Sequence, residues 1–358
     1  MEKYYVAAIN AVNLLGAQRT RRLIEFFRGA EKAWRAEQSL LEKSGLPPKA
    51  FEAFLEFRHQ NPDAPQILAE FCANKKVGLC SFFDEDYPPL LKEIDAPPPV
   101  FYYKGNLQTF AERIAIVGTR HSTNYGERVT KKISGELAEV GFTIVSGAAF
   151  GIDTYAHRSA VKFGRTVAVL GHGISQIPGE KKKLMAEIAE RGGLVMTEFS
   201  PNFHANAGTF PTRNRIIAGL SRGVIVVEAG TKSGALITSS YAGEYGRDVF
   251  AVPGGIFSEK SDGCNALIRD GAILIRSAQD VLEFYNLAEK KKPANIEPVE
   301  LTGAEKKIFD LIPAGDYIEP DDILNQLDEL ETNEISQIIL QLEMKNLIIN
   351  NGDRYTRT

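Results

Sequence analysis

The sequence predicts an α/β protein built on a doubly wound parallel sheet, and two observations from residue 113 onward predict it. Short apolar runs typical of buried strands recur, and amphipathic helical segments such as ERVTKKISGELAEV and EKKKLMAEIAER separate them. Short apolar strands that alternate with helices of about 10–15 residues indicate a parallel sheet with helices on both faces. The predicted strands are residues 114–117, 143–145, 166–170, 194–197, 224–227, 249–252 and 272–275.

The composition is that of a protein with a substantial apolar core. The chain has 358 residues, 44% of them hydrophobic and 25% charged, which excludes wholesale disorder and predicts two or three domains. No stretch approaches the about 20 apolar residues of a membrane span, and the N-terminus lacks a basic-then-apolar leader. We therefore expect a cytoplasmic protein with no membrane contact. Three irregularly spaced cysteines, Cys72, Cys80 and Cys264, indicate reduced core thiols rather than a disulfide frame or a metal site.

Residues 1–78 are predicted to form a helical domain that resembles helix-hairpin-helix or SAM-like bundles. NLLGAQRTRRLIEFF and SLLEKSGLPPKAFEAFLEF each place apolar residues at helical spacing around a turn. The first turn reads Gly16-Ala17-Gln18, so it lacks the Gly-x-Gly of a phosphate-binding hairpin, and we expect a packing role. The following segment DEDYPPLLKEIDAPPPVFYYKGN contains five prolines, which predicts an ordered linker ending in a strand.

The C-terminal part is predicted to consist of a linker at 289–298 and a winged-helix-like domain at 299–358. The expected helices are LTGAEKKIFDLI, EPDDILNQL and NEISQIILQLEMKNL, followed by short strands around Asn351-Gly352-Asp353. Charge separates this part from the middle of the chain. Residues 111–292 carry 23 basic and 18 acidic side chains, whereas residues 293–358 carry 5 and 14. A net charge of +5 favours a polyanion in the middle, and −9 in the tail repels one.

The candidate site residues follow the predicted strands, because ligands of such sheets bind at the carboxyl ends of the strands. Gly118 and Arg120 follow the first predicted strand, and Ser146 and Gly147 follow the second. Glycines let a backbone approach a ligand closely, and helix N-termini offer free N–H groups to an anion. Neither loop matches G-x-G-x-x-G, and the chain contains no G-x-x-x-x-G-K-[ST], so P-loop ATP hydrolysis is not expected.

Two further loops add cations and an aromatic ring to the same sheet edge. In GTFPTRNRII, an aromatic residue, two arginines and an amide stand near a helix start, a set that can clamp a phosphate and stack a base. In EAGTKSGALIT, a lysine, a hydroxyl and a glycine amide form another phosphate cradle. The candidates in these loops are Phe210, Arg213, Asn214, Arg215, Lys232, Ser233 and Gly234.

Five motifs in this order resemble the DprA/Smf family of DNA-processing proteins. They are IAIVGTR, VSGAAFGIDTYAH, FPTRNRIIAGLS, VVEAGTKSGALITSSYA and VPGG…SDGCNALIRDGA, within residues 80–285. The resemblance implies an extended Rossmann domain at 79–288 that works as a homodimer. It also implies a protein that binds single-stranded DNA and loads the RecA recombinase onto it during natural transformation, with no cofactor. Some relatives have a lysine three residues before the motif's phenylalanine, where this chain has Ala207.

The alternative function is an enzyme, a nucleotide N-glycosidase resembling phosphoribohydrolases on the same type of fold. Those enzymes carry P-G-G-x-G-T-x-x-E, whereas the corresponding EAGTKSGALITS has no acid between Gly230 and Glu244. Asp153 and His157 are four residues apart and can share a helix face, but they have no third ligand for a metal. We therefore expect a binding protein with no catalytic residue and no metal.

Overall fold

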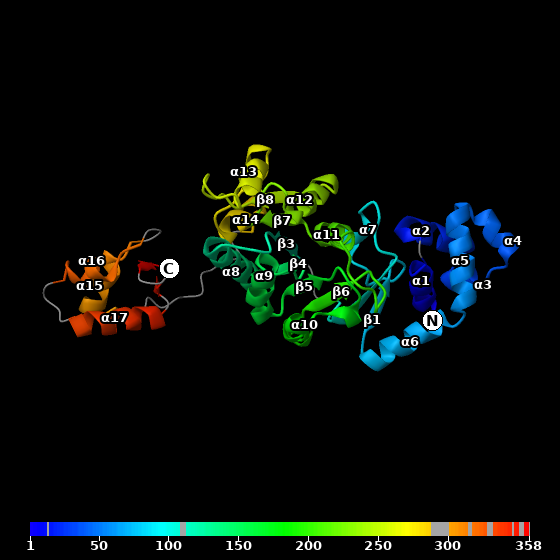
Figure 1. Ribbon diagram of the computed structural model, residues 1–358, viewed down its shortest axis with the longest axis horizontal. Helices are drawn as coiled ribbons and strands as arrows, with labels where there is room; N and C mark the ends of the chain where they lie inside the picture. The colour runs from blue at the N-terminus through cyan, green and yellow to red at the C-terminus, as the bar shows by residue number, and fades with distance from the viewer. Residues whose placement is uncertain are drawn as a thin grey trace. The chain divides into compact units, whose positions relative to one another are not determined.

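The computed structural model describes residues 1–12, 14–107, 112–287, 301–313, 317–327, 332–345, 347–350 and 354–357. The chain folds into two compact units, Met1–Lys290 and Lys291–Thr358 (Figure 1). The predicted linker at 289–298 and the predicted turn at Asn351-Gly352-Asp353 lie outside the described residues.

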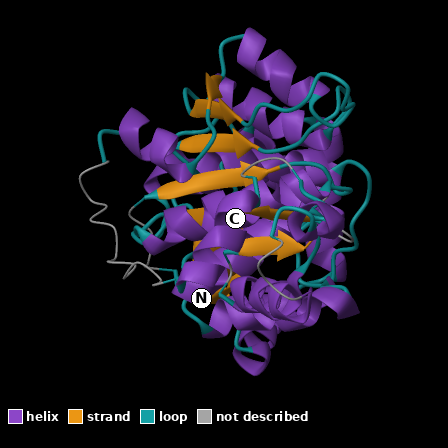
Figure 2. Ribbon diagram, turned by 90° about the vertical axis from the view of Figure 1, so that its left-hand side faces the viewer, coloured by secondary structure: helices purple, strands orange, loops and turns teal. Residues whose placement is uncertain are grey.

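The first unit is built on one mixed sheet of nine strands in the order β1-β2-β6-β5-β4-β3-β7-β8-β9. Strands β3 to β9 are all parallel, and β2 pairs antiparallel with both β1 and β6. Figure 2 shows the strands side by side with helices around them. The strands are β1 Gly78–Ser81, β2 Val100–Gly105, β3 Arg113–Val117, β4 Thr143–Ser146, β5 Thr166–Val169, β6 Leu194–Thr197, β7 Gly223–Val226, β8 Asp248–Ala251 and β9 Ile273–Leu274.

The seven predicted strands are therefore confirmed, as β3 to β9, to within one or two residues at their ends. The predicted strand at the end of the proline-rich segment is β2, and that segment also contains the one-turn helix α7 Pro89–Lys92. Strand β1 was not predicted. It has only four residues, and its pairing with β2 rather than its own pattern defines it.

Alternate residues of each strand face two helical layers, which is why the strands are apolar along their whole length. Ala115 and Val117 of β3 pack with α11, α12 and α13, whereas Ile114 and Ile116 pack with α8, α9 and α14. The helix α10 covers β5 and β6 on the latter side. These helices are α8 Asn124–Glu139, α9 Ile152–Ala160, α10 Gly179–Glu190, α11 Thr209–Leu220, α12 Gly234–Glu244, α13 Asp262–Arg269 and α14 Ala278–Phe284, with short 3-10 turns at Val161–Phe163 and Ile174–Gln176.

The N-terminal helices pack on the β1 and β2 end of the sheet. Their buried side chains form one cluster with Leu79, Val100 and Tyr102 of these strands, so they extend the core of the first unit. That residues 1–78 form a separate SAM-like or helix-hairpin-helix-like domain stays a prediction. The helices are α1 Glu2–Asn10, α2 Gly16–Phe27, α3 Ala30–Arg35, α4 Gln38–Leu41, α5 Pro48–Gln60 and α6 Ala64–Lys75, with a 3-10 turn at Glu42–Ser44.

The described residues of the second unit form three helices followed by a two-stranded antiparallel sheet. A capping box starts the first helix, because Thr302 and Glu305 each accept a hydrogen bond from the other's backbone N–H. Ile308, Ile323, Ile335 and Leu342 are among the side chains of its small core. Its classification as a winged-helix domain stays a prediction. The elements are α15 Gly303–Leu311, α16 Pro320–Leu324, α17 Thr332–Met344, β10 Ile348–Asn350 and β11 Tyr355–Arg357.

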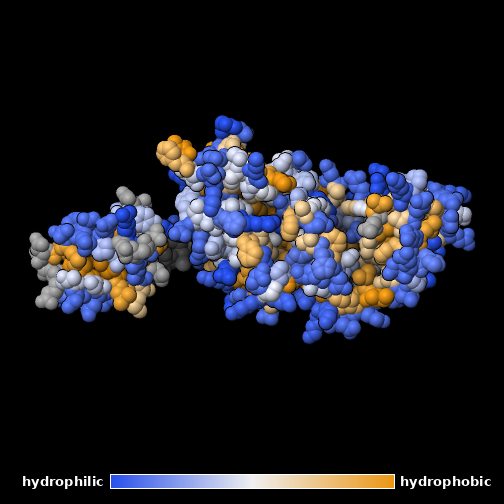
Figure 3. All heavy atoms as spheres, viewed as in Figure 1, coloured by the Kyte–Doolittle hydropathy of each residue, from blue (hydrophilic) through white to orange (hydrophobic). Residues whose placement is uncertain are grey.

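The three cysteines are free and buried, as predicted. Burial raises the pKa of Cys80 and of Cys264 to about 12, so both thiols stay protonated and unreactive near neutral pH. Hydrophilic side chains cover much of the surface of the first unit that is visible in Figure 3. Within the described ranges, no helix is long and apolar enough to cross a membrane.

Candidate functional site

A cavity in the first unit lies where the strand order of the sheet reverses. After β3 the chain adds β4, β5 and β6 on one side and then β7, β8 and β9 on the other, so the loops after β3 and β7 diverge. A crevice at such a point is the usual ligand site of a doubly wound sheet. The cavity measures about 760 Å³ and is lined by the loops after β3, β4, β7 and β8 and by the first turns of α11 and α12. We call it the switch-point cavity.

Arg120 and Phe210 form a cation–aromatic pair in this cavity. The guanidinium carbon of Arg120 lies 5.0 Å from the centre of the Phe210 ring, and the Arg120 side chain is exposed. On another side the ring packs against the backbone of Gly171, where an added Cβ would lie only 2.9 Å from the ring. The half-buried Phe210 ring thus lies in the wall of the cavity, between the Gly171 backbone and the exposed Arg120 guanidinium.

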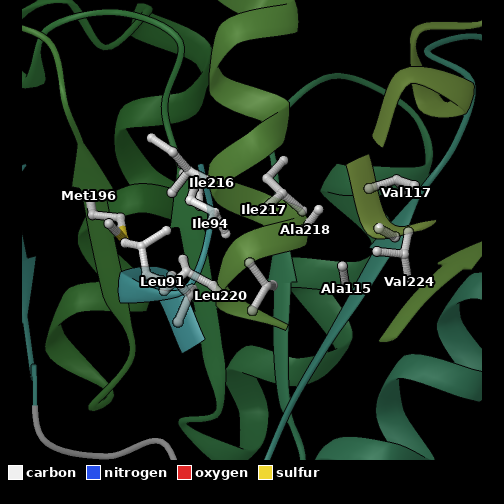
Figure 4. Close-up of a cluster of buried hydrophobic side chains, with 14 of the residues drawn as sticks. Leu91, Ile94, Ala115, Val117, Met196, Ile216, Ile217, Ala218, Leu220 and Val224 are labelled. Carbon is white, nitrogen blue, oxygen red and sulfur yellow. The ribbon is translucent and has the colours of Figure 1, made fainter. Parts of the chain in front are cut away.

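Helix α11 holds this ring in place because its C-terminal half is anchored in the core. Figure 4 shows Ile216, Ile217 and Leu220 in the cluster of buried side chains that also contains Leu91 and Ile94. All of these side chains are at most 3% exposed. The first turn of α11, which carries Phe210, consequently projects from a rigid element.

Arg213 is an internal clamp rather than a surface cation. Only 4% of the residue is exposed, and its Nη1 donates to the carbonyl oxygens of Gly147 and Val169. Burial lowers the pKa of Arg213 to about 10, so it remains charged at neutral pH. A Cβ added at Gly147 would lie 2.4 Å from the same Nη1, so a larger residue there would have to displace the Arg213 guanidinium. Arg213 thus ties the ends of β4 and β5 to α11 beneath the cavity.

Asp153 provides the charge that opposes Arg213. Its Oδ2 accepts hydrogen bonds from the backbone N–H groups of Gly147 and Ala149, each at 3.2 Å. Burial raises the pKa of Asp153, and Arg213 and these hydrogen bonds act against the rise. The carboxyl group therefore fixes the loop after β4 through these hydrogen bonds, and it interacts electrostatically with the Arg213 guanidinium.

The start of α12 supplies the opposite wall. Ser233 caps the helix, since its hydroxyl accepts from the N–H of Ala235 at 3.3 Å. The carbonyl of Gly234 accepts from Nδ2 of Asn214 at 3.1 Å, which links α12 to α11. Lys232 lies exposed beside this helix N-terminus and lines the cavity. A lysine and free helix amides together suit an anion.

The structure brings eight of the eleven predicted site residues together at the switch-point cavity, and Ser146, Gly147 and Arg215 do not line it. Ser146 is fully buried and its hydroxyl donates to the carbonyl of Ile116 at 2.7 Å. Arg215 is paired with Glu198, and both side chains are about nine-tenths buried. The side chains of Ser146 and Arg215 are therefore both engaged inside the fold, and Gly147 lines only a smaller neighbouring cavity. The residues that line the switch-point cavity are Gly118, Arg120, Phe210, Arg213, Asn214, Lys232, Ser233 and Gly234.

The sequence did not single out Lys260, which also lines the cavity. Its ammonium group donates to the carbonyl of His121 and joins the loops after β8 and β3. The glycine-rich loop after β8, within the VPGG…SDGC motif, could have indicated a ligand site. The residues around Lys260 in the sequence, however, do not distinguish it from other surface lysines.

The carboxylate of Glu228 has a role in the fold. Both carboxylate oxygens of Glu228, at the end of β7, accept from Thr123, through its backbone N–H at 2.9 Å and its hydroxyl. Glu228 thereby fixes the start of α8, where Thr123 is the N-cap. Among the residues that the structure describes, no group of three or more histidine, cysteine, aspartate or glutamate side chains could hold a metal ion.

His157 is a buried packing residue, as expected. Its Nδ1 lies 2.7 Å from the hydroxyl of Thr166. Desolvation, together with the charges of Arg213 and Lys181, lowers the pKa of His157 to about 3. The folded state thus favours the neutral ring.

The lowered pKa of His157 predicts that the fold loses stability in acid. A histidine whose folded pKa lies below its unfolded value of about 6.5 stabilises the fold above that pH, and the contribution falls as the pH drops toward 3. Because of His157, we expect the free energy of unfolding to fall by about 2 kcal/mol when the pH is lowered from about 6.5 to about 5, at about 1.4 kcal/mol per pH unit. Urea unfolding at both pH values should show a smaller loss for His157→Gln than for the unmodified chain. An identical loss in both proteins would contradict this assignment.

The fold and the cavity define a class: an α/β protein with a doubly wound sheet and a cationic, partly aromatic ligand site at its switch point. A family model described as DNA recombination-mediator protein A matches residues 78–286, from the first strand to the end of the region around α14. The chain therefore belongs to the family of DNA recombination-mediator protein A.

Relatives from several bacteria agree with this assignment. Protein Smf of Synechocystis is 43% identical over 289 residues, which cover 78% of this chain and 72% of that protein. DNA processing protein DprA of Streptococcus pneumoniae is 43% identical over 234 residues, which cover 65% and 81%.

Two solved structures share the fold. The X-ray structure of DprA from Streptococcus pneumoniae aligns with a TM-score of 0.69 at 38% identity over 79% of this chain and 98% of that one. The Helicobacter pylori protein aligns with a TM-score of 0.54 at 30% identity over 59% and 96%, and its structure was described for its single-stranded DNA binding mode.

Proposed function

We propose that this chain is a DNA-processing protein that binds single-stranded DNA in the switch-point cavity. The observation that carries the proposal is the convergence of Arg120, Lys232 and Phe210 at one cavity. Family membership and the DNA binding described for the Helicobacter pylori relative support it.

The chemistry of the cavity suits a strand whose bases are free. Arg120 and Lys232 would contact phosphates, and the backbone N–H groups at the start of α12 would donate hydrogen bonds to a further phosphate oxygen. A base would stack on Phe210, an interaction worth about 1–3 kcal/mol in other single-strand binders. Phosphate contact and stacking carry little sequence information, so we expect binding without strong sequence preference.

Salt dependence tests this function. Two or three neutralised phosphates predict that log K falls with log salt at a slope of about −1.4 to −2.1, at about 0.7 per phosphate for single strands. The measurement is fluorescence anisotropy of a labelled oligothymidylate between about 50 and 200 mM salt. An affinity that does not change with salt would contradict phosphate binding.

We also propose that the bound strand is handed to the RecA recombinase in the cytoplasm, as the family resemblance implies. The test is whether the purified chain speeds assembly of the recombinase on single-stranded DNA. Residues 299–358 are proposed to form a winged-helix-like domain and residues 1–78 a SAM or helix-hairpin-helix-like one. A solution structure of each segment expressed alone would test these assignments.

We propose that the protein works as a homodimer, because two cavities on one assembly would lengthen the occupied strand and add avidity. We place the dimer interface at the end of the sheet formed by β9. Strand β9 is an edge strand, and Leu274 of β9 and Phe284 of α14 are 45% and 43% exposed. Sedimentation at micromolar concentration should show a species of twice 39.4 kDa. A strictly monomeric species, with and without oligonucleotide, would contradict the dimer.

Binding is favoured over the N-glycosidase alternative. The N-glycosidase motif places its glutamate after the corresponding strand, whereas this chain has no acid between Gly230 and Glu244. Glu228, just before that loop, has both oxygens engaged by Thr123. Incubation with nucleoside monophosphates should therefore release no free base. Release of base at a rate that scales with protein would overturn this conclusion.

A further inference from the structure

A second cavity of about 270 Å³ adjoins the switch-point cavity. The two share Arg120, Ala149, Phe210 and Arg213 as lining residues, so they meet at the Arg120–Phe210 pair. The rest of the second cavity comes from the loop after β4, from the segment between β5 and α10, and from the segment before α11. No part of it belongs to the loops after β7 and β8.

The second cavity contains its own pair of a cation and an aromatic ring. The Nζ of Lys181 lies 4.3 Å from the centre of the Phe150 ring, and Phe150 is 54% exposed. The ammonium group also donates to the carbonyl of Ala148, which leaves two of its three N–H donors for a ligand. His172 and His204 line the same cavity. The second cavity therefore combines a cation with an aromatic ring, as Arg120 and Phe210 do where the two cavities meet.

The repeated chemistry has a geometric consequence. A strand whose base stacks on Phe210 and whose phosphate meets Arg120 is already at the boundary of both cavities. Its next nucleotide then has two directions, toward Lys232 and α12 or toward Lys181 and α10. An exposed aromatic ring under a lysine supplies both contacts that a nucleotide needs, a stacking face and a cation for the phosphate.

We propose that the second cavity is a second nucleotide subsite, in which Phe150 stacks on a base and Lys181 contacts a phosphate of the strand that occupies the switch-point cavity. This inference rests on the proposed function and names where the strand continues. The path of the DNA then runs across the ends of β5, β4, β3 and β7, from α10 to α12.

Two variants with matched controls test the subsite. Lys181→Ala should weaken binding of a long oligothymidylate about fivefold or more and should make the salt slope less negative by about 0.7, the value of one phosphate. Phe150→Ala should weaken binding about fivefold or more and leave the slope unchanged, because stacking releases no counterions. The controls are Lys182→Ala, an exposed lysine on the same helix, and Phe163→Ala, an aromatic residue that is 43% exposed.

The outcomes separate this inference from the function on which it rests. If Lys181→Ala and Phe150→Ala bind like their controls while Arg120→Glu is impaired, the subsite is wrong and the proposed function stands. If Lys181→Ala binds weakly with an unchanged slope, Lys181 does not contact a phosphate and the inference also fails. If the folded, unmodified chain binds no single strand, the proposed function itself fails. Phe150→Tyr, which keeps the ring, should restore affinity and rules out a folding defect as the cause.

Discussion

Arg120→Glu is expected to weaken single-stranded DNA binding tenfold or more, the largest loss of affinity for any single substitution in this chain. Arg120 is exposed, lines both cavities and lies over the Phe210 ring. A hydrogen bond to a charged group is worth about 1.5–3 kcal/mol, and each 1.4 kcal/mol is tenfold in affinity. The reversed charge also repels the neighbouring phosphate. Every sequence should lose affinity alike.

The matched control is Arg128→Glu. Arg128 is exposed on α8 and lines neither cavity, so it gives the same change in net charge away from the proposed path. Anisotropy titrations of both variants should separate them by about tenfold. Equal affinities would mean that the net charge of the unit, and not the cavity, attracts the strand.

Arg213→Met is expected to destabilise the first unit by about 3–5 kcal/mol, the usual cost of removing one partner from a buried charged network. The substitution leaves Asp153 buried without its cation and the carbonyl groups of Gly147 and Val169 without their donor. For the unit Met1–Lys290, about 1 kcal/mol corresponds to about 1.6 °C, at about 2.1 cal/mol/K of unfolding entropy per residue. The melting temperature should therefore fall by about 5 °C or more.

A double variant isolates the charge. Asp153→Asn combined with Arg213→Met removes both ions, so it should be more stable than Arg213→Met alone. A melting temperature that stays unchanged in Arg213→Met, together with a loss of DNA binding, would show that Arg213 is a ligand contact and not an internal clamp.

Strands β3 to β7 were predictable because they are buried on both faces. A run such as Ile114–Val117 is apolar at every position since both helical layers cover it. Strand β1 was not predictable in the same way. Its four residues gain their strand conformation from pairing with β2, a long-range contact that no local pattern indicates.

The site was predictable to the extent that topology alone places it. Gly118, Lys232 and Phe210 meet because the carboxyl ends of parallel strands meet at one edge. Arg213 and Arg215 show the limit. They are two residues apart on α11, hence about 200° apart around the helix axis, and the side that points to the cavity depends on how α11 packs. Arg213 consequently lies beneath the cavity and Arg215 pairs with Glu198.

Lys181 and Phe150 were not predicted as site residues for a related reason. They are far apart in the sequence, one at the start of α10 and the other before α9, and only the fold of the loop after β4 brings them within 4.3 Å. Their motifs are ordinary for a surface helix and a glycine-rich loop. Tertiary contact, rather than composition, therefore reveals the second cavity.

A crystal structure of the chain with an oligothymidylate bound is the most direct test of the central claim that the switch-point cavity holds single-stranded DNA. The proposal predicts a base stacked on Phe210 and phosphate oxygens within hydrogen-bond distance of Arg120 and Lys232. A strand ordered on another surface of the protein, with the switch-point cavity filled only by water, would contradict it.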